Sequence, residues 1–532
     1  MTSPPRSSTV PSGYAPLDPQ SAAGPHAASG TVQQEPVLLL DRVRSSRLLS
    51  GTVLLGLAGA ILMATMAVGA GGILVTDPLI TGGPLSWIRY GHGHDLATVV
   101  LYAGVGMIVW AWVRLGRDVL SGTATVRQVQ VATVVWTAPV LLSPPLFTRD
   151  VYSYLAQGAL ALRGLDPYQV GPWVLPPGPL LDNVAPIWRG TPAPYGPLFI
   201  LLAKAVNLVT GEDLILGVIG MRLVLLIGLA VLIVALPRLA DQLGGDRAVT
   251  LWLVTANPMT VVHLVGGPHN DLLMIGLLVA GTLLVLIRRH AAGIAVVTAA
   301  TAVKASAVIA LPFLVWIWAA RLPGRRGAQL VRAGAGSLAV FGAVFTGISL
   351  VSGLGLGWIP ALQAPSLIVN WMSLPTAAGQ LAHALTTPFD DMSERPFIMV
   401  SRLLGAGVFL IVLARQWWLA RDGGPQALRR AALVLLWLAL LAPATLPWYF
   451  TWALALGAAL PWSRRGLVWA VAGSTWLVLC SYPTGDLELS WWPYQLAVLT
   501  VSLLAASALL RRDPLGLRRR PHLVDPAPAG TG

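Results

Sequence analysis

The chain contains several apolar stretches of about 18 or more residues with few or no charged side chains, and these stretches limit what it can fold into. A stretch of that length can cross a bilayer as a helix, whereas barrel strands alternate apolar and polar residues over roughly 10 residues. Only 11% of the residues are charged, against about 25% in a soluble domain. The sequence therefore predicts an all-α polytopic membrane protein.

We expect a disordered cytoplasmic tail over residues 1–45, because this segment is rich in Pro, Ser, Ala and Gly. A transmembrane domain over 46–511 and a cytoplasmic tail over 512–532 follow. The apolar run from Leu48 to Val75 exceeds the roughly 7–15 residues of a signal-peptide core, so it predicts an uncleaved first span. The bundle is expected to have about 13–14 spans. The predicted spans are 49–75, 97–114, 129–147, 214–236, 248–267, 271–288, 291–305, 306–320, 333–353, 397–418, 431–447, 449–462, 466–482 and 491–510.

The positive charge of the chain is distributed as in a membrane protein. The net charge is +13, and the arginines lie in short connections between apolar runs and in the C-terminal stretch RRDPLGLRRRP. This pattern follows the positive-inside rule, aided by anionic lipids, and places both termini in the cytoplasm. Nothing resembles a basic groove with interleaved aromatics, so we expect no nucleic-acid partner. Cys480 is the only cysteine, which excludes a disulfide or a cysteine-based metal site within one chain.

Two segments need a topological decision. Residues 291–318 begin and end beside arginines assigned to the cytoplasm, so we expect two short helices that turn near Lys304. Residues 194–211 have external neighbours on both sides, which predicts a helix that enters the membrane and returns. The longest loops on the predicted external side are 148–213 and 354–396, and long loops often carry function.

The first of these loops begins with TRDVYSYLAQGALALRGLDPYQVGP, an unusual concentration of ionisable and aromatic residues. The spacing predicts one helix over 148–164, with Thr148 as N-cap and an apolar stripe beside a polar stripe that includes Asp150. Such a helix would lie at the membrane surface with its polar face toward a cavity. The alternative is structural: Asp150 complements the helix dipole and Arg149 neutralises it.

Further polar candidates lie at predicted turns. GPHNDLLM places His269, Asn270 and Asp271 at the outer end of two spans, where they either contact a substrate or form a polar turn with Asp271 as helix cap. Lys304 is one of two lysines in the chain and lies between two apolar runs. An intramembrane cation is costly and indicates a functional site, for which a phosphate is a natural partner. The alternative is a side chain that reaches the outer interface.

Aromatic residues accompany these candidates. LPWYFTW, with Trp448 and Tyr449, follows an apolar span, and Tyr195 lies in the proline-rich RGTPAPYGPL. Such rings either form an interfacial belt or stack on the C–H face of a sugar. No P-loop, GxGxxG, HExxH or GxSxG motif occurs in a supporting context. The combination of external carboxylate, membrane-edge cation and aromatics fits an enzyme acting on a lipid-phosphate-linked sugar.

Four stretches together resemble the actinobacterial polyprenyl-phosphomannose-dependent α-(1→6)-mannosyltransferases: FTRDVYSYLAQGALALRGLDPYQVGP, TANPMTVVHLVGGPHNDLLM, TAVKASA and PWYFTW. The resemblance extends from about residue 50 to 510. This family of GT-C superfamily membrane enzymes builds the mannan core of lipomannan and lipoarabinomannan. The resemblance implies a GT-C-like helix bundle with external juxtamembrane helices, located in the plasma membrane with an external active site. GT-C enzymes place the acidic loop after the first span, so we interpret 49–114 as an N-terminal addition.

The resemblance also implies roles for individual residues. Asp150 would be the catalytic base that activates the acceptor hydroxyl in an inverting transfer from polyprenyl-phosphate mannose to a lipid-anchored α-(1→6)-mannan. No metal or other cofactor is expected, although convergence of Asp150, Asp166 and Asp271 is an alternative. The residues expected to bind the donor phosphate or sugar are Lys304, His269, Arg149, Asn270 and Asp271. The residues expected to line the substrate site are Tyr152, Tyr154, Gln157, Asp166, Tyr168, Tyr195, Trp448 and Tyr449.

Two other functions remain open at the level of sequence. The first is a GT-C transferase for another polyprenyl-phosphate sugar, arabinose or glucose. The second is a flippase or transporter of lipid-linked sugars, which would favour inverted repeats and paired charges at mid-membrane depth. The polar groups instead gather toward one side of the predicted bundle, and no repeat is visible.

Overall fold

The computed structural model describes residues 48–71, 83, 86–388, 392–482 and 491–511, so the tails predicted over 1–45 and 512–532 lie outside the described residues. No strand occurs in the described part. Its first helices are α2 (Gly51–Ala70), η1 (Ser86–Arg89), α3 (Gly91–Leu120), α4 (Val126–Leu141), α5 (Asp150–Leu162), η2 (Pro172–Val174), α6 (Pro179–Asn183), α7 (Pro186–Arg189), α8 (Pro197–Thr210), α9 (Leu214–Leu243) and α10 (Arg247–Val254). The next are η3 (Thr260–Gly266), α11 (Asp271–Leu286), α12 (His290–Val303), η4 (Ala305–Ala310), α13 (Leu311–Ala319), α14 (Arg326–Ser352), α15 (Trp358–Ala361) and η5 (Ala364–Leu367). The last are α16 (Leu374–Thr386), α17 (Glu394–Leu419), α18 (Gly424–Leu441), η6 (Pro447–Tyr449), α19 (Phe450–Gly457), α20 (Arg464–Leu479) and α21 (Trp492–Leu510).

The prediction of an all-α polytopic membrane protein is confirmed. Every predicted span coincides with helical structure, and seven helices in the described part are long and apolar enough to cross a membrane: α2, α3, α9, α14, α17, α18 and α21. The pair η3 and α11, bent by 110°, would make an eighth span. The remaining predicted spans lie on shorter helices, so the predicted total of about 13–14 spans stays a prediction.

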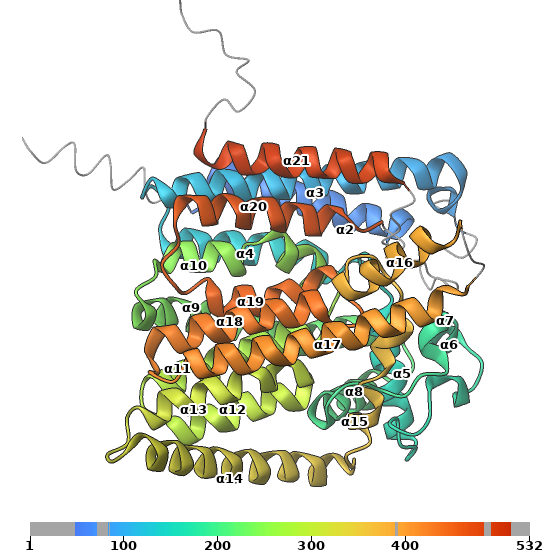
Figure 1. The fold of residues 1–532 in the computed structure, drawn as a ribbon. Coiled ribbons are helices and arrows are strands. Elements are labelled where there is room, and N and C mark those ends of the chain that lie inside the picture. Colours follow the sequence, from blue (N-terminus) through green and yellow to red (C-terminus); the bar gives the residue numbers. More distant parts are fainter. Residues whose placement is uncertain (1–47, 72–82, 84–85, 389–391, 483–490, 512–532) are drawn as a thin grey trace, which may run out of the picture. The chain divides into compact units, whose positions relative to one another are not determined.

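Neighbouring helices approach closely where small residues meet. In Figure 1, α3, α20 and α21 run side by side. Helix α9 packs against α11. A Cβ atom at Gly276 of α11 would lie only 2.5 Å from the main-chain oxygen of Gly228 in α9. Small residues permit such close helix contacts in membranes, where lipid supplies little hydrophobic drive for association. This contact holds the first turns of α11, which begins with Asp271, against α9.

The segment 291–318 is divided as predicted. Helix α12 ends at Val303, Lys304 adopts an extended conformation with φ −147° and ψ 127°, and the short η4 leads into α13. Lys304, at this break, lines a pocket between helices. The segment 194–211 contains α8, whose 14 residues are too few to span a bilayer.

The helix that carries Asp150 differs from the prediction in its surroundings. It spans Asp150–Leu162 and not 148–164, although the Thr148 hydroxyl does accept a hydrogen bond from the Asp150 main-chain N–H. The prediction of a surface helix with one polar face was wrong, because Val151 to Ala161 are all buried. Helices α8, α9 and α6 pack around α5 and cover the faces that sequence periodicity left open.

A buried arginine connects the end of α4, which precedes Asp150, to the end of η3, which precedes His269. Arg222 of α9 is 1% exposed, and its guanidinium donates hydrogen bonds to main-chain carbonyls on both sides. Nε donates to Val265 at 3.1 Å and Nη2 to Gly266 at 2.6 Å, while Nη1 donates to Leu141 at 3.0 Å and Nη2 also to Pro144 at 3.2 Å. Arg222 therefore joins the end of α4 to the end of η3.

Replacement of Arg222 by leucine is expected to lower the melting temperature of the detergent-solubilised protein strongly. Hydrogen bonds to charged groups contribute about 1.5–3 kcal/mol each to stability. The carbonyl groups that accept from Arg222 would remain buried without a donor. The matched control is Arg238→Leu, which changes an exposed arginine on the same helix. Similar melting temperatures for the two variants would contradict a structural role for Arg222.

Candidate active site

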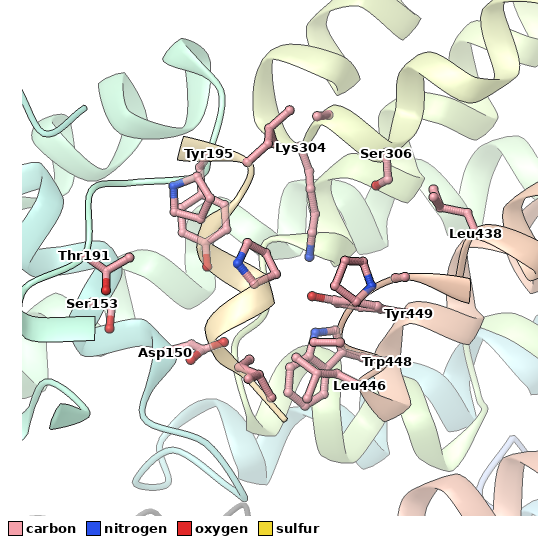
Figure 2. Close-up of a pocket in the computed structure, with 18 of the residues that line it drawn as sticks. Asp150, Ser153, Thr191, Tyr195, Lys304, Ser306, Leu438, Leu446, Trp448 and Tyr449 are labelled. Carbon is pink, nitrogen blue, oxygen red and sulfur yellow. The ribbon is translucent and has the colours of Figure 1, made fainter. Parts of the chain in front are cut away.

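A pocket of about 310 Å³ opens where α5, η4, η6 and the loop before α8 meet. Figure 2 shows Asp150 and Lys304 reaching into this pocket from different elements, with Tyr449 and Trp448 on a third side. The pocket brings together segments that lie far apart in the sequence. The predicted site residues that line it are Asp150, Tyr154, Gln157, Tyr195, Lys304, Trp448 and Tyr449.

The carboxylate of Asp150 forms one wall of the pocket. Asp150 is the first residue of α5, and its side chain is 21% exposed. Nδ1 of His269 lies 3.5 Å from Oδ2 of Asp150, and the His269 ring is fully buried. That ring stacks on Trp448 with centroids 3.5 Å apart and an interplanar angle of 18°. The His269 ring thus contacts two residues that line the pocket, Asp150 and Trp448, and does not line the pocket itself.

The second wall carries a buried ion pair that the sequence analysis did not predict as a pair. Nζ of Lys304 lies 2.9 Å and 2.8 Å from the two carboxylate oxygens of Asp271, which is fully buried. The indole N–H of Trp452 donates to the same carboxylate. Because an ammonium group has three hydrogens, the bidentate contact leaves one donor of Lys304 for a ligand in the pocket.

Aromatic rings surround the Lys304 ammonium. Nζ lies 4.8 Å from the centroid of Tyr449 and 5.4 Å from that of Trp452, and these two rings stack at 4.4 Å. Cation–π contacts of this kind attract an ammonium group electrostatically to the ring faces. The ammonium is therefore held by one carboxylate and two ring faces, and its side chain is only 15% exposed.

Tyrosines close the pocket near α5. Tyr154 and Tyr195 meet edge to face with centroids 5.1 Å apart, and Phe199 packs against both rings. Burial raises the pKa of Tyr195 well above its usual range, and the nearby Asp150 carboxylate raises it further. Tyr195 therefore stays protonated at neutral pH and can donate a hydrogen bond to a hydroxyl or phosphate oxygen.

Several predicted site residues shape the surrounding loop and do not line the pocket. Nε of Arg149 donates to the Asn183 carbonyl at 2.9 Å, and its Nη2 donates to the Asp182 carbonyl at 3.0 Å. Asp166 accepts hydrogen bonds from the Tyr168 main-chain N–H at 2.9 Å and from a neighbouring glutamine side chain. The Tyr168 hydroxyl in turn donates to the Tyr195 carbonyl at 2.9 Å, so these residues fix the loop that carries Tyr195.

Two further predicted residues are buried beside the site. Tyr152 is 3% exposed on α5, and Asn270 is fully buried directly before α11. Neither lines the pocket. Trp452 was not predicted as a site residue from the sequence. It belongs to the LPWYFTW stretch and lies four positions after Trp448, which places the two residues on the same side of a helical turn.

The suggested convergence of Asp150, Asp166 and Asp271 is wrong. Asp271 is paired with Lys304 and Asp166 with its own loop. Among the residues that the structure describes, no group of three or more His, Cys, Asp or Glu side chains is arranged to hold a metal ion.

The fold and the pocket together define a polytopic membrane protein that holds a carboxylate, an ammonium group and several aromatic rings around one pocket. A family model described as the α-(1→6)-mannopyranosyltransferase N-terminal domain matches residues 53–320, and one described as the MptB C-terminal domain matches 375–511. The chain belongs to this α-(1→6)-mannopyranosyltransferase family. Both walls of the pocket include residues of the first matched region, and Trp448, Tyr449 and Trp452 come from the second.

Curated relatives cover most of the chain. It is 45% identical to α-(1→6)-mannopyranosyltransferase A of Mycobacterium tuberculosis over 470 residues, which is 87% of this chain and 90% of the relative. It is 34% identical to α-(1→6)-mannopyranosyltransferase A of Corynebacterium glutamicum, covering 72% and 82% of the two chains. It is 29% identical to α-(1→6)-mannopyranosyltransferase B of the same species, covering 75% and 71%. No solved structure matches the chain.

Proposed function

We propose that the protein is an inverting α-(1→6)-mannosyltransferase that uses polyprenyl-phosphate mannose as donor and a lipid-anchored mannan as acceptor. The observation that carries the proposal is the placement of the Asp150 carboxylate and the Lys304 ammonium in one aromatic pocket. The names of the relatives, α-(1→6)-mannopyranosyltransferases, support the sugar and the linkage. The product would extend the mannan core of lipomannan and lipoarabinomannan.

In the proposed reaction, Asp150 accepts the proton of the acceptor 6-hydroxyl while that oxygen attacks the anomeric carbon of the donor mannose. The new C–O bond forms on the face opposite the phosphate, and the bond between the anomeric carbon and the phosphate oxygen breaks. The products are an α-(1→6) linkage and a polyprenyl phosphate. The deprotonated hydroxyl is the stronger nucleophile, which is why a positioned carboxylate accelerates the step.

Lys304 would stabilise the departing phosphate. The leaving group gains negative charge as the glycosidic bond breaks, and a fixed ammonium in a water-poor pocket lowers the free energy of that charge. Asp271, Tyr449 and Trp452 hold the ammonium in place before the reaction, so little reorganisation is needed. This chemistry needs no metal ion.

His269 would act through Asp150. Its ring is buried, stacks on Trp448 and faces the Asp150 carboxylate, and it does not line the pocket in which the donor phosphate is proposed to bind. A hydrogen bond from Nδ1 would orient the carboxylate toward the acceptor hydroxyl. We therefore assign His269 as a positioning residue, in place of the phosphate contact expected from the sequence.

The polyprenyl chain would occupy the apolar side of the pocket. Leu362, Pro365, Ile368, Leu438 and Leu446 line the pocket and contribute no charge. An isoprenoid chain gains free energy from apolar contacts, at about 0.8 kcal/mol per buried CH₂ group. The charged phosphate would then lie at the boundary between this apolar side and Lys304.

The direct test is incubation of the purified protein with polyprenyl-phosphate mannose and a short α-(1→6)-mannoside. We expect elongation of the mannoside by one α-(1→6)-linked mannose, identified by mass spectrometry and linkage analysis. Polyprenyl-phosphate arabinose and glucose serve as competing donors. Preferential use of either competitor would overturn the donor assignment, and movement of the lipid across vesicles without any new glycosidic bond would favour a transporter.

We further propose that the pocket faces the outside of the plasma membrane, with both termini in the cytoplasm. Trp173 is 67% exposed on the loop after α5, and Gln242 is exposed near the other end of the bundle, on α9. In a variant with Cys480→Ser, Trp173→Cys should react with an impermeant maleimide on intact cells, whereas Gln242→Cys should react only after permeabilisation. The reverse pattern would show that the orientation is inverted.

A further inference from the structure

A second cleft, with a volume of about 790 Å³, shares no lining residue with the pocket that contains Asp150. It is lined by the start of α2, the end of α3, the start of α20 and the end of α21. Figure 1 shows the last turns of α21 and the first turn of α20 at the same end of the bundle. Helix α4, which has 16 residues and is about 24 Å long, lies in the sequence between Ser121, which lines this cleft, and Asp150, which lines the pocket.

The cleft has a strong positive charge. Four arginines and one aspartate line it, which gives a formal charge of +3. Arg117 is held by the ends of its neighbours, because it donates to the carbonyls of Ala508 and Arg511, and its guanidinium lies 5.2 Å from the Trp110 ring centroid. The other three arginines are Arg114, Arg464 and Arg511, and all three are exposed. A cleft with this charge attracts an anion with several acceptor oxygens.

The same cleft also exposes apolar surface. Trp110 is 40% exposed, Leu120 38% and Leu510 49%, and all three line it next to the arginines. A small inorganic anion would leave these side chains without a partner. A phospholipid supplies both an anionic headgroup for the guanidinium groups and acyl chains for the apolar side.

We propose that this cleft is a binding site for one anionic phospholipid, with its phosphodiester at Arg114, Arg464 and Arg511 and an acyl chain along Trp110 and Leu510. Guanidinium groups suit this role, because their planar donors bind phosphate oxygens in pairs. The site is separate from the proposed transfer reaction. The lipid would join the ends of four helices that meet at the cleft, and so it would stabilise the bundle.

The test compares two neighbouring arginines at the start of α20. Arg464 lines the cleft, whereas Arg465 is exposed and does not. Delipidated protein in neutral detergent is melted with short-chain phosphatidylglycerol, with phosphatidylcholine of the same chain length, or with inorganic phosphate. A ligand that binds only the folded state raises the melting temperature, and we expect phosphatidylglycerol near 100 times its Kd to raise it by about 3 °C or more.

The shift with phosphatidylglycerol should persist in Arg465→Gln and fall by at least about half in Arg464→Gln, since the latter loses a charge-assisted contact. Arg511→Gln provides a second variant with the same expected loss. Native mass spectrometry should retain one phosphatidylglycerol on the wild type and on Arg465→Gln, and less on the two cleft variants.

Three results would overturn the proposal. Equal losses in Arg464→Gln and Arg465→Gln would indicate general surface attraction. An equal shift with phosphatidylcholine would remove the need for an anionic headgroup, and an equal shift with inorganic phosphate would remove the need for a lipid. Mannosyl transfer by Arg464→Gln in detergent should match the wild type, so failure of the lipid site is distinguishable from failure of the proposed reaction.

Discussion

Replacement of Asp150 by asparagine is expected to lower turnover by at least about a hundredfold, because general-base catalysis typically contributes about 10²–10⁴-fold. Asparagine keeps the size of the side chain but cannot accept the proton of the acceptor hydroxyl. The helix should survive the change, since the aspartate contributes only a modest dipole interaction at the start of α5. The measurement is the initial rate of mannosyl transfer at matched levels of folded, correctly inserted protein.

Asp166→Asn is the matched control. Asp166 lies in the same region but bonds to its own loop, and asparagine keeps an oxygen that accepts from the Tyr168 N–H. This variant should retain most of the wild-type rate and bind the lipid donor normally. A larger loss in Asp166→Asn than in Asp150→Asn, or near-normal turnover in Asp150→Asn, would move the base elsewhere.

Replacement of Lys304 by alanine is expected to impair both donor use and folding. Loss of the phosphate contact should lower kcat/KM for the donor by at least about thirtyfold, corresponding to roughly 2 kcal/mol or more. The variant also leaves the buried Asp271 carboxylate without its cation, and breaking a buried pair in this way typically costs about 3–5 kcal/mol of stability. Donor kinetics and thermal melting measure the two effects separately.

A double variant distinguishes the two roles of Lys304. Lys304→Met with Asp271→Asn removes both charges, while the Asn side-chain oxygen still accepts from the Trp452 indole. We expect this protein to regain most of the lost stability but to remain poor in donor use. Lys304→Arg should retain only part of the wild-type donor use, because the planar guanidinium group of arginine does not replace a compact ammonium group between two rings. Full recovery of donor kinetics in the double variant would show that Lys304 is purely structural.

Much of the architecture could be predicted from the sequence, because the bilayer imposes simple requirements on a chain. Long apolar runs must be helices in lipid, and each predicted span indeed lies on helical structure. The break at Lys304 was also predictable, since the arginines on both sides of 291–318 require two passes. The polar stretch after Thr148 predicted a candidate site, because ionisable groups beside a membrane are costly without a purpose, and Asp150 from this stretch does line the pocket.

The environment and partners of those groups depended on the tertiary structure. Periodicity suggested a surface position for α5, but helices from elsewhere in the chain bury it on every side. Asp271, Lys304 and Trp452 are chemically suited to one another, yet 33 residues separate the first two and 181 separate Asp271 from Trp452. His269 was expected at the donor phosphate, and the structure places its ring 3.5 Å from the Asp150 carboxylate. The sequence by itself determined that the long apolar runs form helices, because an apolar run of that length favours helical structure through its local composition. Only the packing of distant helices decided which polar groups meet, because a buried charge is stable only where the fold supplies its partner.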